Sequence, residues 1–396
     1  MPKAVIVAPW FGVESGGAEI ALLKIANGLI ALGYEVEIFT SRSIVPYGDW
    51  LENPEPNERE LISGIPVSRF SVDVRGFDRY VRAVAALKDP KNMNYYMRDD
   101  FFRYGMTSCD LVAAVSALPE DVLIIGGPFY QALIHNVVSA CPGRVIVMPA
   151  FHDEVPFYFE SVTRLIRSAR GLLLLTEAEK QLAIRVHGHA FDRAKFETPV
   201  LSLPYINETL VRDNSSSLTA KLLGDYMLYV GRLDEGKNIT QLMQWHHAAC
   251  ENMRREGEDV VPLIMVGSGV IPEFKSQFVR FAGRVDEVEK AKLLSAAMGL
   301  VNLSLNESFS FVVFEAWQHK IPVLVHKKCE VMRSHVDESL GGYACETPSE
   351  YFSALQHFKN KTLNDILGWN GVKYADKVCD WDGFLRRLRG IVEVCS

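Results

Sequence analysis

The sequence predicts an α/β protein with two domains, each built on a mainly parallel sheet. Short apolar runs alternate with helical patterns over nearly all of the 396 residues, as in successive βαβ units. A chain of this length corresponds to two or three domains at roughly 100–200 residues each. The polar stretch Asn207–Asp225, with Asn-Ser-Ser-Ser at 214–217, divides the runs into two sets.

The apolar runs predict buried strands by their length and β-branched content. In the first set they are Ala4–Ala8, Val36–Thr40, Val67–Ser71, Val122–Ile125, Arg144–Pro149, Leu172–Thr176 and Val200–Pro204. In the second they are Met227–Gly231, Leu263–Gly267, Val279–Gly283, Leu300–Leu303 and Pro322–His326. We therefore expect a first domain over residues 1–205 and a second over 206–380, followed by an amphipathic helix at Trp381–Val394.

Composition excludes several classes of protein. Hydrophobic residues at 48% and charged residues at 23% are typical of globular proteins, not of disordered or collagen-like chains. No apolar run approaches the ~20 residues of a membrane span, and no signal-peptide pattern is present, so we expect a cytoplasmic protein. Seven scattered cysteines favour reduced thiols over a zinc site. The net charge of −7 argues against nucleic-acid binding.

A glycine-rich turn, Gly12–Glu19, follows the first predicted strand and opens a helical pattern. Gly16 and Gly17 would let backbone N–H groups approach a phosphate at the positive end of that helix. The pattern G-x-G-x-x-G is absent, which disfavours NAD binding. The alternative is a tight turn that needs a positive φ.

A second loop, Gly231–Asn238, follows the strand at Met227–Gly231. It has the spacing G-x-x-x-x-G-K, but Asn238 stands where a P-loop needs a hydroxyl for magnesium. Arg232 and Lys237 would neutralise a diphosphate without metal at this strand's carboxyl end. A solvated charged loop is the alternative.

Two further segments follow predicted strands. Glu307 falls in the turn after Leu300–Leu303, and a helix from Ser310 would carry Glu315. Its free N–H groups near Phe311 and Val312 would face an anion. His152 follows the strand at Arg144–Pro149. It would hydrogen-bond a substrate hydroxyl, with Asp153 orienting its ring, or else be a structural histidine.

Together these motifs resemble the retaining glycosyltransferases of family 4, the glycosyl transferases group 1. The resemblance rests on GGAE, His-Asp, Gly-Arg-x4-Lys-Asn, and Glu-x7-Glu with a following Ile-Pro-Val strand. It implies the GT-B fold, in which two Rossmann-like domains face each other across a cleft. The first domain would bind the acceptor and the second the nucleotide sugar. The final helix, about 381–396, would pack back on the first domain.

The resemblance also implies catalytic roles for four residues. Arg232 and Lys237 would hold the donor diphosphate. Glu307 would lie by O3 and O4 of the transferred sugar, and His152 would touch that sugar and its developing charge. No metal ion or other cofactor would be required.

The resemblance further implies a set of donor-binding residues: Gly16, Gly17, Arg232, Lys237, Ser310, Phe311, Val312 and Glu315. Glu315 would hold the ribose hydroxyls, and the two glycines would bring backbone close to the phosphate or acceptor. Ser310 stands where the family commonly has Gly, and His319-Lys320 precede Ile-Pro-Val where it usually has Gly. The sugar pocket is therefore expected to be narrower or differently hydrogen-bonded.

The expected function is transfer of a hexosyl group from a nucleotide-diphosphate sugar to an acceptor hydroxyl in glycan, polysaccharide or glycoconjugate biosynthesis. UDP is favoured over GDP on family frequency, and the acceptor is a glycan, a lipid-linked glycan or a small molecule. The alternatives are a non-catalytic sugar-nucleotide-binding subunit, a P-loop-like nucleotidase and a GT-B epimerase.

Aromatic and basic residues alternate in Asn94–Met106, and Arg164, Arg167 and Arg170 recur at three-residue spacing. Such faces can lie on an anionic membrane or grip an extended acceptor. Peripheral contact with the inner face of a membrane is therefore one expectation, and ordinary packing with solvated arginines is the other.

Overall fold

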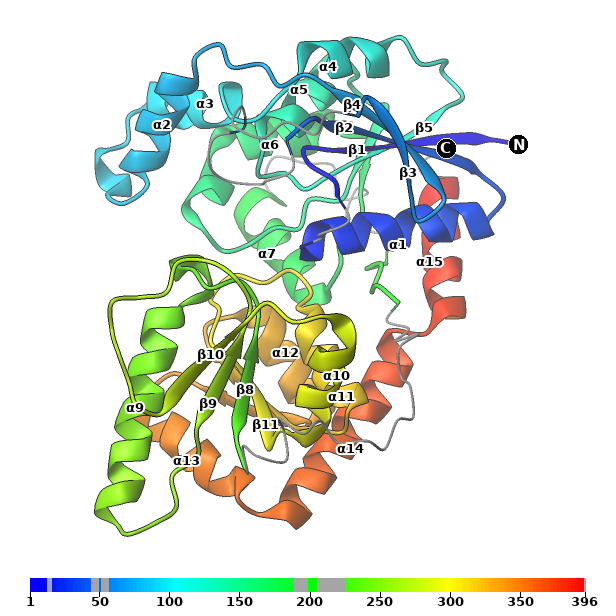
Figure 1. Ribbon diagram of the computed structural model, residues 1–396. Helices are drawn as coiled ribbons and strands as arrows, with labels where there is room; N and C mark the ends of the chain where they lie inside the picture. The colour runs from blue at the N-terminus through cyan, green and yellow to red at the C-terminus, as the bar shows by residue number, and fades with distance from the viewer. Residues whose placement is uncertain (13–15, 44–49, 51–56, 189–198, 205–224, 395–396) are drawn as a thin grey trace. The chain divides into compact units, whose positions relative to one another are not determined.

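The apolar runs build two separate sheets in the computed structural model, which describes residues 1–12, 16–43, 50, 57–188, 199–204 and 225–394 (Figure 1). The chain divides into two compact units. The first unit comprises Met1–Leu203 with Asp382–Ser396, and the second comprises Pro204–Trp381. All but one residue of the predicted linker Asn207–Asp225 lie outside the described residues.

The first unit contains a seven-stranded sheet in the order β3-β4-β2-β1-β5-β6-β7. Its strands are β1 (Lys3–Ala8), β2 (Glu35–Ser41), β3 (Arg59–Ile62), β4 (Ile65–Phe70), β5 (Leu123–Gly126), β6 (Val145–Val147) and β7 (Gly171–Leu172). All pairs are parallel except the edge hairpin of β3 with β4. Without β3, the strands have the order of a Rossmann sheet.

Helices of the first unit connect these strands. They are α1 (Gly17–Ala31), α2 (Phe77–Ala86), α3 (Tyr95–Arg103), α4 (Cys109–Ser116), α5 (Ala132–Ala140), α6 (Glu160–Ser168) and α7 (Glu177–His187), with the 3-10 turns η1 (Pro90–Asn92) and η2 (Val155–Tyr158). Buried Val and Ile from β1, β5 and β6 pack with buried phenylalanines from the helices and loops.

One strand prediction in the first unit was wrong, and one strand was not predicted. Val200–Pro204 forms no strand, because Ser202 adopts a left-handed backbone with φ 43°. Leu201 N–H and Ser202 N–H still donate to the carbonyls of Leu174 and Leu175, beyond the end of β7. Strand β3 was missed because two of its four residues are charged, as suits an exposed sheet edge.

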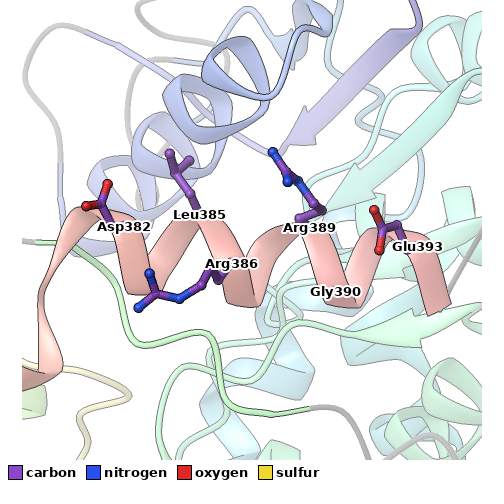
Figure 2. Close-up of a pocket in the computed structure, with 6 residues that line it drawn as sticks. All are labelled: Asp382, Leu385, Arg386, Arg389, Gly390 and Glu393. Carbon is purple, nitrogen blue, oxygen red and sulfur yellow. The ribbon is translucent and has the colours of Figure 1, made fainter.

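The predicted final helix is present as α15 (Trp381–Val394). Helix α15 packs closely against α1 at Gly28. A Cβ at this position would lie only 2.6 Å from Phe384 and 2.7 Å from Leu388. Figure 2 shows the residues of α15 that line a surface pocket: Asp382, Leu385, Arg386, Arg389, Gly390 and Glu393. None of the residues that the sequence singled out for the site is among them.

The second unit contains a six-stranded, fully parallel sheet in the order β10-β9-β8-β11-β12-β13. Its strands are β8 (Met227–Val230), β9 (Leu263–Val266), β10 (Val279–Gly283), β11 (Gly299–Asn302), β12 (Val323–His326) and β13 (Gly342–Cys345). Five match the predicted runs to within a residue or two. Strand β13, with sequence GYAC, lacks an apolar run and was missed. This order is again that of a Rossmann sheet.

The helices of the second unit are α9 (Ile239–Arg255), α10 (Glu287–Ala296), α11 (Phe311–Gln318), α12 (Glu330–Ser339), α13 (Pro348–Phe358) and α14 (Lys361–Val378), with the 3-10 turn η5 (Glu235–Lys237). Helix α9 packs with α13, and α14 packs with α11 and α12 (Figure 1). Among the described helices of both units, none is long and apolar enough to cross a membrane.

Candidate functional site

The strand order of the second unit indicates a candidate site at the centre of the sheet. Strands β8 and β11 are neighbours, and the connections that leave them run to opposite sides of the sheet. In open α/β sheets, ligands bind at such a switch point, outside the carboxyl ends of the strands. The loop after β8 carries Arg232 and Lys237, and the loop after β11 carries Glu307.

Lys237 and Glu307 meet across this switch point. The Nζ atom of Lys237 donates to Oε1 of Glu307 at 2.7 Å. The two side chains are only 22% and 13% exposed, so water screens the pair less than it screens a surface ion pair. The structure therefore brings together two predicted site residues that lie on separate loops.

The loop after β8 is fixed by close backbone packing. Gly231 N–H donates to Val266 O at 3.0 Å, and Leu233 N–H donates to Ser268 O at 2.9 Å. A Cβ on Gly267 would lie 1.8 Å from the carbonyl oxygen of Gly231, and its φ is +146°, so only glycine fits there. The loop is thus held against the neighbouring β9 loop.

Arg232 lies on the same loop but points to a different partner. Its Nε atom is 3.4 Å from Oδ2 of Asp234, and its side chain is 47% exposed. The carbonyl of Arg232 accepts from the Tyr229 hydroxyl at 2.7 Å. The backbone is therefore anchored while the guanidinium reaches solvent, where a long side chain can turn toward an anion.

Helix α11 begins at Phe311, one residue after the predicted start at Ser310, and carries Glu315 as predicted. Phe311 and Val312 lie in its first turn, where N–H groups lack carbonyl partners within the helix and the helix dipole favours an anion. Ser310 precedes the helix with φ 65° and ψ 68°, in the left-handed region. That conformation is uncommon outside glycine and clusters at functional sites.

Glu315 is buried and pairs with a residue that the sequence analysis did not select. Lys290, on α10, lies 3.2 Å from Glu315 and 2.7 Å from Glu287. Burial acts to lower the pKa of Lys290, but the two carboxylates outweigh it, so its pKa is raised. A single lysine inside a helical pattern carries no motif, which is why only the structure reveals it.

Asn302, the last residue of β11, is a second group missed by sequence. It is buried, and its Nδ2 atom lies 3.4 Å from Oε1 of Glu307 and 3.4 Å from Oγ of Ser310. Its Oδ1 atom accepts from Ser304 N–H at 3.0 Å. The amide therefore links the loop of Glu307 to the start of α11.

The glycine-rich turn of the first unit differs from the expectation. Gly16 has φ −84°, and neither Gly16 nor Gly17 has the positive φ that the tight-turn alternative requires of a glycine. The N–H of Gly16 already donates to Oε2 of Glu19 at 2.7 Å. Glu19 is the third residue of α1, and the spacing of a capping box would have indicated this contact.

His152 lies after β6, with its side chain 30% exposed. Its Nδ1 atom is 3.3 Å from Oε1 of Glu154. Asp153 instead accepts from the Tyr158 hydroxyl at 2.5 Å. The expectation that Asp153 orients the imidazole was wrong, and Glu154 takes that place.

A fully buried carboxyl supports the backbone beside His152. Oε1 of Glu179, on α7, accepts from Phe151 N–H at 2.8 Å, and Oε2 accepts from Leu175 N–H at 2.6 Å. Burial raises the pKa of Glu179 to about 8. The sequence Thr176-x-x-Glu179 has capping-box spacing, which predicts the helix start but not the bond to Phe151.

Comparison with known proteins finds similar sequences among glycosyltransferases. Residues 224–359 match the family model described as "Glycosyl transferases group 1". The chain is 23% identical over 412 residues to the D-inositol 3-phosphate glycosyltransferase of Frankia alni, covering 90% of each chain.

Solved structures share the fold over the full length. An E. coli structure described as trehalose-6-phosphate bound with UDP-2-fluoro glucose matches with a TM-score of 0.73 at 11% identity, covering 99% of this chain and 98% of that one. Sucrose-phosphate synthase from Thermosynechococcus elongatus matches with a TM-score of 0.63 at 15% identity, covering 99% of this chain and 98% of that one. WaaG, a glycosyltransferase involved in lipopolysaccharide biosynthesis, matches with a TM-score of 0.61 at 15% identity, covering 98% of this chain and 99% of that one. The predicted GT-B fold is confirmed.

Proposed function

We propose that this chain, a glycosyltransferase of the GT4 type with the GT-B fold, transfers a hexosyl group from a UDP-sugar with retention of anomeric configuration and without a metal ion. A GDP-sugar is the second choice of donor. The second unit binds the donor, the first unit binds the acceptor, and the product belongs to glycan, polysaccharide or glycoconjugate biosynthesis.

The contact between Lys237 and Glu307 carries this proposal. It joins a cation and a carboxylate at the switch point of a Rossmann sheet. The cation suits the donor diphosphate, and the carboxylate suits hydroxyl groups of the sugar that the diphosphate bears. One contact thus positions groups for both halves of a nucleotide-diphosphate sugar.

Three positive groups support binding of the diphosphate. Lys237 and the half-exposed guanidinium of Arg232 supply full charges, and the first turn of α11 supplies N–H groups that have no carbonyl partner within the helix. Negative charge grows on the diphosphate as the bond to the sugar breaks. Preorganised donors stabilise such charge most strongly in the transition state, so these groups supply what a divalent ion supplies elsewhere.

Two carboxylates complete the donor site in this proposal. Glu307 accepts from O3 and O4 of the sugar, and Glu315 accepts from the ribose hydroxyls. Lys290 holds Glu315 at 3.2 Å, and Asn302 holds Glu307. Both carboxylates therefore have a partner that keeps them oriented when the donor binds.

The reaction requires no nucleophile from the protein. The acceptor hydroxyl attacks the anomeric carbon on the face that the diphosphate leaves, and its proton passes to the departing phosphate oxygen. We assign to His152 a contact with the transferred sugar and its developing positive charge. Its partner Glu154 keeps the imidazole oriented.

A surface of the first unit fits peripheral contact with an anionic membrane. Tyr95 and Tyr96, at the start of α3, are 59% and 71% exposed. Helix α2 packs against α3, and its residue Val81 is 48% exposed. Helices α2 and α3 also carry Arg82 and Arg98, and Arg98 lies over the ring of Phe159. Exposed aromatic rings beside cations are typical of interfacial helices.

Sedimentation tests the membrane contact. The protein should sediment with vesicles that contain phosphatidylglycerol at low salt, and the double variant Tyr95→Ser, Tyr96→Ser should sediment less. Equal sedimentation of both proteins, or of neither, would remove this part of the proposal.

A donor panel tests the enzymatic proposal. UDP-glucose, UDP-galactose, UDP-N-acetylglucosamine, GDP-mannose and ATP with magnesium are each incubated with the protein, with and without EDTA, and release of nucleoside diphosphate or phosphate is measured. The proposal predicts release from one UDP- or GDP-sugar that survives EDTA. Phosphate release from ATP alone, abolished by EDTA, would support a P-loop-like nucleotidase instead.

A further inference from the structure

Ser310 combines two features that rarely occur together at a loop position. Its backbone is left-handed, with φ 65°, a conformation that glycine adopts without strain and other residues do not. Its side chain is almost fully buried, at 6% exposed. A buried hydroxyl has therefore been placed where the backbone alone would favour glycine.

The hydrogen bonds of Ser310 leave its proton available. Oγ accepts from Asn302 Nδ2 at 3.4 Å, and a hydroxyl has one hydrogen to donate. Within the described residues, the structure gives that hydrogen no acceptor. A buried donor without an acceptor is costly, so the position suits an acceptor that arrives with a ligand.

The same amide connects Ser310 to Glu307. Asn302 Nδ2 also lies 3.4 Å from Oε1 of Glu307, so the hydroxyl and the carboxylate are near neighbours around one nitrogen. Asn302 is itself 3% exposed and held by Ser304 N–H. Asn302 therefore holds two groups side by side: the Glu307 carboxylate, which accepts hydrogen bonds, and the Ser310 hydroxyl, which can donate one.

We propose that the Ser310 hydroxyl, held by Asn302, is a specificity-determining group that donates a hydrogen bond to a substituent oxygen of the donor sugar. This inference rests on the proposed function of the Glu307 site. It adds that the chain distinguishes sugars by the position or kind of oxygen next to Ser310. Recognition of the nucleoside diphosphate does not depend on this hydroxyl.

Two variants of Ser310 separate the hydroxyl from the backbone. Ser310→Ala removes the hydroxyl and keeps the Cβ in the left-handed conformation, whereas Ser310→Gly removes both. Leu340→Gly is the matched control, because Leu340 also has a positive φ, of 52°, and is 65% exposed at the end of α12. It relieves the same kind of strain away from the proposed site.

The experiment measures dissociation constants of UDP, UDP-glucose, UDP-galactose and UDP-N-acetylglucosamine, or of the GDP counterparts if the wild-type protein prefers GDP. We expect Ser310→Ala and Ser310→Gly to reduce the preference for the best sugar over the next best by about tenfold, the size of one hydrogen bond. Binding of UDP itself should change less than twofold, and Leu340→Gly should change neither quantity.

Each other outcome overturns the inference. Unchanged sugar preference in both variants excludes a role for the hydroxyl. An equal loss for UDP and for every UDP-sugar shows that Ser310 only shapes the loop. If the wild-type protein binds none of these nucleotides, the proposed function fails and this inference fails with it.

Discussion

Lys237 Nζ lies 2.7 Å from Glu307 Oε1, a contact between residues 70 positions apart in the chain. Each residue follows one of the two central strands, β8 and β11. The ion pair therefore lies at the switch point of the sheet, where the proposed function assigns Lys237 to a phosphate of the donor. In the proposed function, Lys237 donates to the bound diphosphate, and Asn302 still contacts Glu307.

Removal of the Lys237 charge should disable transfer. We expect Lys237→Ala to lower kcat/KM for the preferred nucleotide sugar by about 10²–10³-fold, the typical effect of deleting one group that stabilises developing negative charge. Lys361→Ala, at the exposed start of α14, serves as the control and should retain full activity. A near-normal kcat/KM in Lys237→Ala would exclude the assigned role.

Lys290 should act through Glu315 on the ribose. Lys290→Met removes the cation that orients this carboxylate, so UDP should bind about tenfold more weakly, as expected for one charge-assisted hydrogen bond. The preference for UDP over 2′-deoxy-UDP should also shrink, which simple unfolding would not cause. Calorimetric titration measures both. If the variant keeps the full preference, Glu315 does not need Lys290.

Glu179 should make the stability of the protein depend on pH. Its pKa is raised from 4.5 to about 8 in the folded state. Between these values the folded protein binds more protons than the unfolded chain, so the free energy of unfolding falls as pH rises through this window. Thermal melts between pH 5 and 8.5 measure this dependence.

The variant Glu179→Gln provides the comparison. It cannot titrate, and its amide can accept only one of the two backbone bonds, from Phe151 and Leu175. Its melting temperature should be lower than that of the wild type at pH 5 and should change less between pH 5 and 8.5. An identical pH dependence in both proteins would show that another group is responsible.

The close packing of α15 against Gly28 of α1 can be tested by two alanine substitutions. Gly28→Ala places a methyl group 2.6 Å from Phe384, which should destabilise the protein by about 1–3 kcal/mol through overpacking. Gly390→Ala, on α15 itself, meets no atom within 4 Å and should stabilise by about 0.5–1 kcal/mol, because alanine favours a helix. Urea denaturation measures both, and equal effects would argue against this packing.

The sequence predicted the elements whose signal is local. Strand–helix alternation identified both sheets, and the helix that begins at Phe311 followed from the turn that precedes it. The positions of the candidate loops after β8 and β11 were also predicted, because carboxyl ends of parallel strands are recognisable in sequence. The contact of Lys237 with Glu307 was not predicted, since it depends on β8 and β11 being neighbours.

The residues that sequence reasoning missed act through distant partners. Lys290 and Asn302 are single polar residues in an ordinary helix and strand, and only the packed structure reveals their carboxylate partners. Glu179 has a local signal, but its bond to Phe151 crosses 28 positions of sequence. The role first given to Asp153 was wrong because proximity in sequence does not fix side-chain direction. Asp153, next to His152, turns to Tyr158, and Glu154, one position further, meets the imidazole.

Binding of a nucleoside diphosphate without metal tests the central claim most directly. Thermal melts of the wild-type protein and of Lys237→Ala are recorded with UDP, GDP, ADP or ATP–magnesium, each with and without EDTA. A ligand present at 100 times its Kd adds about 2.7 kcal/mol to the free energy of unfolding of the protein that binds it. We predict that UDP or GDP raises the Tm of the wild type by several degrees in EDTA and has little effect on Lys237→Ala. Stabilisation by ATP–magnesium alone, or an equal shift in both proteins, would contradict the assignment of this site.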